Sequence, residues 1–240
     1  MWSRLLGGAV VVGVAALGAV TAWIAYPTRA DLKLAPPLTS WSPSDAAPDT
    51  YTRDFEALNS AFTPQKYRSF CGPASISTVL QAFGKTQVDQ AELLPSIGDK
   101  LDVFYSGMSL AELHDLAQEV GLRSELAYAD TLSLETFRDR LKSNLQRKGD
   151  FVVINYDRRV LHQSGAGHIS PVGAYDPGRD AFLVLDEASF KYPFTWVPAS
   201  LLYQAVHTRA DGRYRGVLFI HGYNTAAHGT SVDRGEMSPE

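Results

Sequence analysis

The chain has 240 residues, of which 45% are hydrophobic and 11% aromatic, a composition typical of a folded globular protein. Its formal net charge of −4 gives no basic surface of the kind that binds nucleic acid, so no nucleic-acid partner is expected. A single cysteine, Cys71, excludes an intrachain disulfide. The six histidines lack the spacing of metal-ligand pairs, and no protein-bound metal is expected.

The N-terminal segment contains an uncharged run, LLGGAVVVGVAALGAVTAWIAY, of 22 residues. This length matches the hydrocarbon core of a bilayer and exceeds the apolar region of most cleavable signal peptides. The sequence therefore predicts a transmembrane anchor over residues 1–26, with the following domain in the periplasm. The alternative is a signal peptide cleaved after Ala22, which would release the domain into the periplasm.

Composition divides the rest of the chain into three parts. Residues 27–50 contain five prolines and no apolar periodicity, which predicts an extended linker outside the core. Residues 223–240 are polar and predict a disordered tail. One folded domain is expected over residues 51–222.

The expected order of elements in this domain is helices first and strands second. Apolar residues recur at helical spacing after Cys71 and within residues 109–121 and 133–149, and Ser109 with Glu112 forms a capping-box signature. The segments FVVINYD, HISPVGAYD, AFLVLDEA and RGVLFIHG are short and rich in β-branched or aromatic residues, which predicts strands. The fold class is therefore predicted to be α+β.

Cys71 begins a predicted helix and is followed by Gly72 and Pro73. Free backbone N–H groups and the helix dipole at such a position favour the thiolate, which predicts a nucleophile. A nucleophilic thiol needs a base that a third group orients. His168 opens one predicted strand and Asp186 ends the next, with the turn DPG between them. In a hairpin centred on that turn the two side chains lie opposite each other.

Two further residues enter this interpretation. Gln65 lies six residues before Cys71, and its amide is a candidate donor to the oxyanion that forms during acyl transfer. His162 lies in a loop close to His168 and is the alternative candidate for the base.

The segments FCGPASISTVLQAFG and GHISPVGAYDPGRDAFLVLDEASFKYPFTWVP resemble phytochelatin synthase, a papain-like family of glutathione gamma-glutamylcysteinyltransferases. The resemblance covers about residues 51–222 and implies a papain-like fold with a helical first half and an antiparallel sheet in the second half. It places the family's triad on Cys71, His168 and Asp186 and its oxyanion glutamine on Gln65.

The resemblance also implies the chemistry. The cysteine cleaves the Cys–Gly bond of glutathione and forms a gamma-glutamylcysteinyl thioester, which passes to water or to a second glutathione to give phytochelatin. No cofactor bound by the protein is implied, and Cd or Zn thiolates of glutathione are expected as substrate or activator. The expected partners are glutathione, heavy-metal thiolate complexes and, through the N-terminal segment, a membrane.

The chain also departs from the family pattern. Ser189 stands where the family usually has an arginine, three residues after the aspartate. The family's substrate-binding arginine falls on Arg215, and its acidic partner is placed at Asp211. The family's cysteine-rich C-terminal domain has no counterpart here, so the chain resembles the short bacterial forms, for which hydrolysis of glutathione is expected to exceed polymer synthesis.

Two other functions remain open at this point. A papain-fold peptidase of the C39 type, which cuts leader peptides, carries glutamine, cysteine, histidine and aspartate in the same order. A non-catalytic protein that binds metal thiolates is the second alternative, although the intact set of candidate residues disfavours it.

Overall fold

The structure, a computed structural model, describes residues 21–22, 32–42 and 53–224. The helices of this part are α2 (Phe55–Ala61), α3 (Cys71–Ala82), α4 (Ile97–Ser106), α5 (Leu110–Glu119), α6 (Leu134–Leu145) and α7 (Ala199–Val206). The strands are β1 (Thr39–Ser40), β2 (Leu122–Tyr128), β3 (Phe151–Asp157), β4 (Gly167–Asp176), β5 (Ala181–Val184), β6 (Thr195–Pro198), β7 (Arg209–Ala210), β8 (Arg213–Tyr214) and β9 (Gly216–Tyr223). Short 3-10 turns η2 (Ala129–Thr131) and η3 (Arg158–Leu161) follow β2 and β3.

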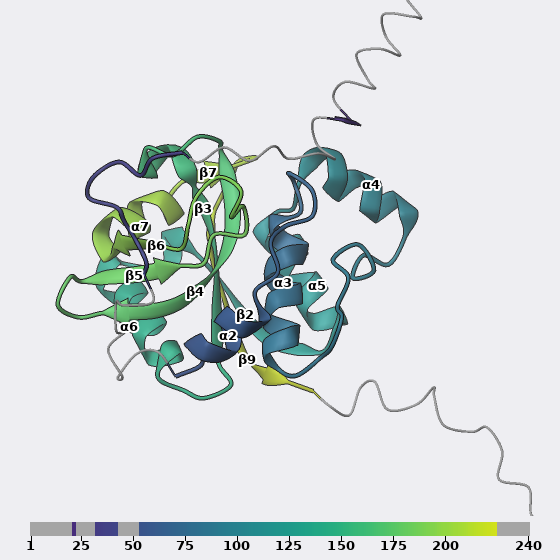
Figure 1. The fold of residues 1–240 in the computed structure, drawn as a ribbon, viewed down its shortest axis with the longest axis horizontal. Coiled ribbons are helices and arrows are strands. Elements are labelled where there is room, and N and C mark those ends of the chain that lie inside the picture. The colour runs from purple at the N-terminus through teal and green to yellow at the C-terminus, as the bar shows by residue number, and fades with distance from the viewer. Residues whose placement is uncertain (1–20, 23–31, 43–52, 225–240) are drawn as a thin grey trace, which may run out of the picture.

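A 7-stranded antiparallel sheet organises the described part of the chain, in the order β1-β6-β5-β4-β3-β9-β2. Both of its faces are covered: α2, α3 and α5 lie on one side and α6 and α7 on the other (Figure 1). Strand β3 is buried along its whole length because Val153 packs into the first layer while Val152 and Ile154 pack into the second. The central strands are therefore rigid supports for side chains at their ends.

The α+β class predicted from the sequence is confirmed, and so are the helices α3, α5 and α6. The capping box at the start of α5 is present, since Ser109 and Glu112 each bond the other's backbone N–H. The division into a helical half and a strand half is too simple. Strand β2 lies between α5 and α6 in sequence and pairs with β9, a long-range partnership that local patterns do not reveal.

Residues 32–42 are not the linker that the sequence predicts. Strand β1 pairs with β6, Leu38 is only 6% exposed, and the Trp41 ring packs edge-on against Phe55. The apolar side chains of Leu38 and Trp41 are what attach this proline-rich segment to the edge of the sheet. At the other end, β9 continues to Tyr223, one residue beyond the predicted end of the domain at 222.

The predicted anchor over residues 1–26 lies outside the described residues except for Thr21 and Ala22. Within the described residues no helix combines the length and the apolar character needed to cross a membrane.

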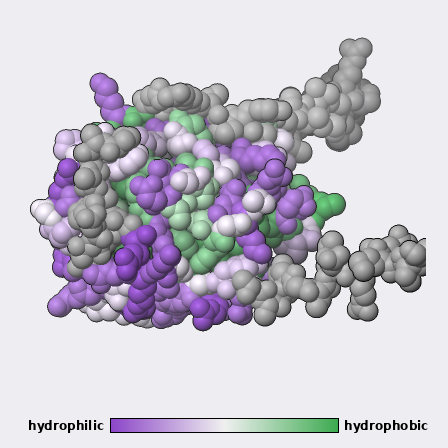
Figure 2. Space-filling view, turned by 60° about the horizontal axis from the view of Figure 1, so that its bottom comes forward, coloured by the Kyte–Doolittle hydropathy of each residue, from purple (hydrophilic) through white to green (hydrophobic). Residues whose placement is uncertain are grey.

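Large hydrophobic side chains that remain exposed are concentrated on α4. Ile97, Leu101 and Tyr105 are 76%, 53% and 47% exposed, and elsewhere in the described residues only Leu32 reaches 36%. Figure 2 shows hydrophobic surface at its right-hand edge, the end of the molecule that α4 occupies in Figure 1.

Candidate active site

Cys71 is the first residue of α3 and is buried, with 8% of its surface exposed. This end of the helix is closely packed: a Cβ atom at Gly72 would lie 2.9 Å from Met108 Sδ, so a larger residue does not fit unless the Met108 side chain moves. Burial raises the pKa of the Cys71 thiol to about 11, although hydrogen bonds from the backbone of Ile169 and Gly72 oppose the shift. The expected preference for the thiolate at a helix start is therefore outweighed by desolvation, and the resting group is the thiol.

His168 lies near the start of β4 and contacts Asp186, with 3.0 Å between Nε2 and Oδ1. The other imidazole nitrogen, Nδ1, is the one left to exchange a proton with a group in the pocket. The imidazole is held from the side by Tyr156, whose ring meets it edge-on at a centroid distance of 5.7 Å. The pKa of His168 is lowered to about 4, first by burial and then by the neighbouring charge of Arg158, while Asp186 opposes both.

The predicted hairpin register is wrong, although the contact it was meant to explain is present. Val172 pairs with Val184 and Asp176 with Ala181, so the residue opposite His168 in this register is not Asp186. The pairing slips at Gly173, where a Cβ atom would lie 2.9 Å from the Phe55 ring of α2. Asp186 follows the end of β5 in an irregular segment, from which its carboxylate turns toward His168.

Arg158, which the sequence analysis did not single out, binds the same carboxylate. Its Nη2 donates to Asp186 Oδ1 at 2.6 Å, and its Nη1 donates to Gln163 Oε1 at 3.0 Å. The guanidinium also lies over the Tyr192 ring and is 2% exposed. Burial alone would raise the pKa of Asp186, but Arg158 and His168 together hold it well below its usual range.

The sequence carried only a weak signal for Arg158. It is one of two consecutive arginines directly after the buried strand β3, and 28 residues separate it from Asp186. The family pattern has an arginine three residues after the aspartate, where this chain has Ser189, which is exposed. The antiparallel pairing of β3 with β4 and of β4 with β5 brings the arginine to the carboxylate.

Gln65 is buried rather than on the surface, with 4% exposed. Its backbone N–H donates to the carbonyl of Glu187 at 2.9 Å. The side-chain Nε2 donates to the carbonyls of Tyr67 and Arg68 at 2.9 and 2.7 Å, and Oε1 has no hydrogen-bond partner. In this arrangement the amide braces the loop before Cys71.

Glu187, next in sequence to Asp186, is a second buried carboxyl group behind the site. It is 0% exposed, and its Oε1 accepts a hydrogen bond from Thr78 of α3 at 3.3 Å. The other oxygen has no partner. Desolvation raises the pKa of Glu187 well above its usual range, and the hydrogen bond from Thr78 offsets only part of that effect.

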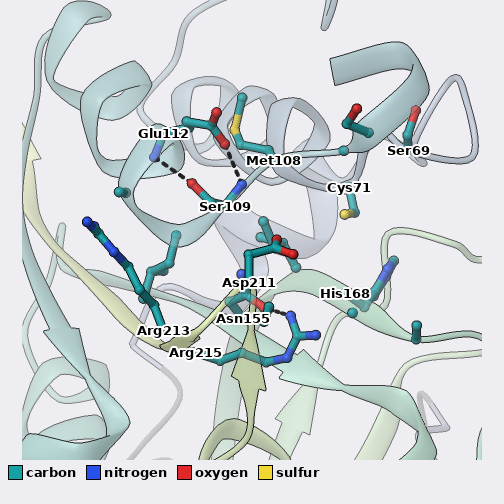
Figure 3. A pocket seen from close by; sticks show the side chains of 18 of the residues that line it. Ser69, Cys71, Met108, Ser109, Glu112, Asn155, His168, Asp211, Arg213 and Arg215 are labelled. Carbon is teal, nitrogen blue, oxygen red and sulfur yellow. Dashed lines mark hydrogen bonds between the residues drawn. The ribbon is translucent and has the colours of Figure 1, made fainter. Parts of the chain in front are cut away.

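A cavity of about 800 Å³ is lined by Cys71 and His168 together with Asp211 and Arg215. In Figure 3 Cys71 and His168 lie at one side of it, Asp211 and Arg215 in the middle and Arg213 at the opposite side. The lining contains five arginines and three acidic residues, which makes the cavity cationic; they are Arg68, Arg159, Arg209, Arg213, Arg215, Asp102, Glu112 and Asp211. Such a lining suits a ligand with more than one carboxylate.

Arg215 and Asp211, the two candidate substrate-binding residues, both line this cavity, but their surroundings differ. Arg215 is 8% exposed, donates from Nη1 to Asn155 Oδ1 at 2.8 Å and leaves its buried Nε without a partner. Burial lowers the pKa of Arg215, while the acidic groups Asp157 and Asp211 raise it. Its guanidinium lies against Gly167, where a Cβ atom would come within 2.6 Å of Nη1. Asp211 is exposed in the β7–β8 turn, with a φ of 51°.

The remaining candidates fall outside the cavity. His162 is exposed at the end of η3 and does not line it. Within the described residues no group of three or more histidine, cysteine, aspartate or glutamate side chains is arranged to hold a metal ion.

Comparison with known proteins gives a consistent result. The family model "Phytochelatin synthase" matches residues 44–216. The chain is 32% identical over 183 residues to "Glutathione gamma-glutamylcysteinyltransferase 2" of Arabidopsis thaliana, with 69% of this chain and 39% of the relative covered. It is 31% identical over 189 residues to "Glutathione gamma-glutamylcysteinyltransferase 1" of Triticum aestivum, covering 72% and 37%.

A fungal relative matches as well. The chain is 28% identical over 178 residues to "Glutathione gamma-glutamylcysteinyltransferase" of Schizosaccharomyces pombe, with 70% of this chain and 43% of the relative covered. The chain thus spans well under half the length of these curated relatives. The α+β architecture is consistent with the papain-like fold of the matched family. The chain belongs to the phytochelatin synthase family.

Proposed function

We propose that this domain is a cysteine acyltransferase that acts on glutathione and passes its gamma-glutamylcysteinyl group to water or to a second glutathione. The observation that carries the proposal is the common cavity of Cys71 and His168, with Asp186 bonded to the imidazole. The names of the relatives supply the substrate. No feature of the site favours the peptidase or the non-catalytic alternative.

The first half-reaction forms the thioester. As Cys71 Sγ attacks the carbonyl carbon of the Cys–Gly bond, His168 takes the thiol proton, since both groups are neutral at rest. Asp186, which stays ionised beside Arg158, stabilises the imidazolium that results. His168 then returns the proton to the leaving amine of glycine, and the gamma-glutamylcysteinyl group remains on Cys71.

The second half-reaction breaks that thioester. His168 accepts a proton from the incoming water or from the amine of a second glutathione and returns it to Cys71 Sγ as the carbon–sulfur bond breaks. Water yields gamma-glutamylcysteine, and glutathione yields phytochelatin. In either case the enzyme returns to its resting state without an oxidant or a reductant.

The oxyanion is proposed to be stabilised by the backbone N–H of Cys71 and by Gln65. Both N–H groups of the Gln65 amide donate to main-chain carbonyls in this structure. The proposal therefore requires one of them to turn to the oxyanion when substrate is bound.

Arg215 and Asp211 are proposed to hold the two ends of the gamma-glutamyl group. Arg215 has a buried Nε without a partner and suits the α-carboxylate, while Asp211, exposed on the β7–β8 turn, suits the α-amine. Cd or Zn thiolates of glutathione are proposed as acceptors or activators, not as a bound cofactor.

Hydrolysis is proposed to exceed transfer. A second glutathione needs a site that holds its carboxylates, whereas water needs none, and Ser189 offers only a hydroxyl where the family usually has an arginine. Ser189→Arg should then raise the ratio of phytochelatin to gamma-glutamylcysteine, measured by mass spectrometry. Phytochelatin as the main product of the wild-type protein would contradict this partition and leave the acylation step standing.

The acylation step is tested by incubating the protein with glutathione, with and without cadmium, and identifying the products. Cys71→Ser and His168→Ala should abolish product formation while the far-ultraviolet spectrum stays unchanged. His162→Ala is the matched control, because that imidazole is exposed and outside the cavity, and it should retain full activity. Loss of activity in the His162 variant alone would show that the base is wrongly assigned.

A further inference from the structure

The exposed face of α4 has no function in the chemistry proposed above. Ile97, Leu101 and Tyr105 are spaced four residues apart, so they form one stripe along the helix, which we call the α4 stripe. Val103, on the opposite side of α4, is buried, and the Phe104 ring beside the stripe packs edge-on against Tyr67, so both side chains attach the helix to the domain. The α4 stripe is thus held outward on an ordered helix.

The α4 stripe lies where the N-terminal apolar run meets the domain. Thr21 Oγ1 is 3.1 Å from Tyr105 Oη. Thr21 belongs to the uncharged run of 22 residues that ends at Tyr26, and most of that run precedes it in the sequence. One end of the α4 stripe, at Tyr105, therefore contacts the part of the chain whose sequence is best suited to hydrocarbon.

We propose that the α4 stripe rests in the interfacial region of a lipid bilayer, next to the point where the apolar run enters it. A helix with one apolar face and charged residues on its other faces is the usual element for this depth. Tyr105 suits the boundary, since its ring prefers the interface and its hydroxyl stays hydrated. This proposal does not depend on the reaction at Cys71.

The charges of α4 point to a neutral lipid surface rather than an anionic one. Asp99 and Asp102 flank the only basic residue of the helix, Lys100. Attraction to acidic headgroups is therefore not expected to contribute, and phosphatidylcholine should suffice. Asp102 and Tyr105 also line the catalytic cavity, so the bound lipid would lie beside its entrance.

A single-cysteine chain provides the test, because Cys71 is the only native thiol. In a full-length Cys71→Ser background, Leu101→Cys is labelled with an environment-sensitive fluorophore and mixed with phosphatidylcholine vesicles. A blue shift is expected, together with quenching by lipids that carry a nitroxide near the headgroup. Leu32→Cys is the matched control, an exposed leucine outside the α4 stripe, and its label should show neither effect.

Four outcomes would overturn the proposal. The Leu101 label fails to respond to vesicles, or it responds no more than the Leu32 label does. A blue shift that grows with protein concentration without vesicles would instead assign the α4 stripe to a second copy of the chain. Adding Ile97→Asp to the labelled chain should remove most of the quenching, and unchanged quenching would show that the stripe does not carry the contact.

Discussion

Asp186 and Glu187 are consecutive residues with nearly the same burial, 1% and 0% exposed, yet their pKa values are shifted in opposite directions. Asp186 receives hydrogen bonds from Arg158, His168 and the backbone of Ala188. Glu187 receives one from Thr78 and leaves an oxygen without a partner. The pKa of the first is lowered and that of the second is raised. Partners, not depth, decide which carboxyl group is charged.

The two neighbouring residues also support different parts of the site around Cys71. The ionised Asp186 orients His168 on the side of the cavity. Glu187, through its backbone carbonyl, supports the loop that carries Gln65. Substitutions at four positions test this separation, taken in order of expected effect.

Asp186→Asn should have the largest effect. The amide keeps the shape of the side chain but supplies no charge to stabilise the imidazolium or fix the tautomer of His168. We expect a loss of about a thousandfold or more in kcat, measured with glutathione as substrate. Glu187→Gln, the matched change one residue away, should leave kcat nearly unchanged. Equal losses in the two variants would remove the distinction.

Arg158→Met should remove the cation that keeps Asp186 ionised. Breaking a buried pair costs about 3 kcal/mol or more, measured by urea unfolding at neutral pH. Because a lowered pKa stabilises the fold only above the unfolded value, the difference from wild type should shrink as the pH falls below about 4. Arg158 also lowers the pKa of His168, so the acid limb of kcat/KM should move to higher pH.

Arg158→Lys serves as the control for charge. It keeps the cation but not the two-pronged contact with Asp186 and Gln163, and the acid limb should stay near the wild-type position. A shift as large as that of the methionine variant would show that geometry, not charge, sets the pKa of His168.

Gln65→Ala should slow acylation by about a hundredfold, the usual loss for one oxyanion donor. KM should change little, because the donor acts on the transition state. A purely structural brace predicts another pattern, in which the melting temperature falls and kcat is preserved.

Glu187→Gln should have the smallest effect on activity, and its main consequence should be a gain in stability that depends on pH. Because the folded pKa lies well above 4.5, the wild-type fold loses stability as the pH rises from that value toward the folded pKa. Glutamine avoids the loss, so the variant should gain about 1.4 kcal/mol per pH unit within this window. Denaturant unfolding at pH 5 and pH 7 measures the gain, and parallel curves would contradict it.

Local signals predicted the parts of the site that depend on local structure. The start of α3 at Cys71, the capping box of α5 and the strand that opens near His168 follow from spacing and turn residues. The contact of Arg158 with Asp186 could not be predicted in this way, because it depends on the packing of β3 against β4. The raised pKa of Cys71 results from burial, whereas its position at the start of a helix predicted a lowered pKa. The edge strand β1 was not predicted because the prolines around it indicated a linker, whereas Leu38 and Trp41 pack against the domain.

The place of β9 in the sheet has a consequence for the order in which the site is assembled. Strand β9 is the last element of the described chain, yet it lies between β3 and β2 and carries the arginine at its head, Arg215, into the cavity. During synthesis from the N-terminus, the thiol, the imidazole and their carboxylate are all made before this strand. Until it pairs, β2 and β3 both present open edges. The nascent chain therefore contains Cys71, His168 and Asp186 before Arg215 is made, and the pairing of β9 joins β2 to the rest of the sheet as it brings Arg215 into the lining of the cavity.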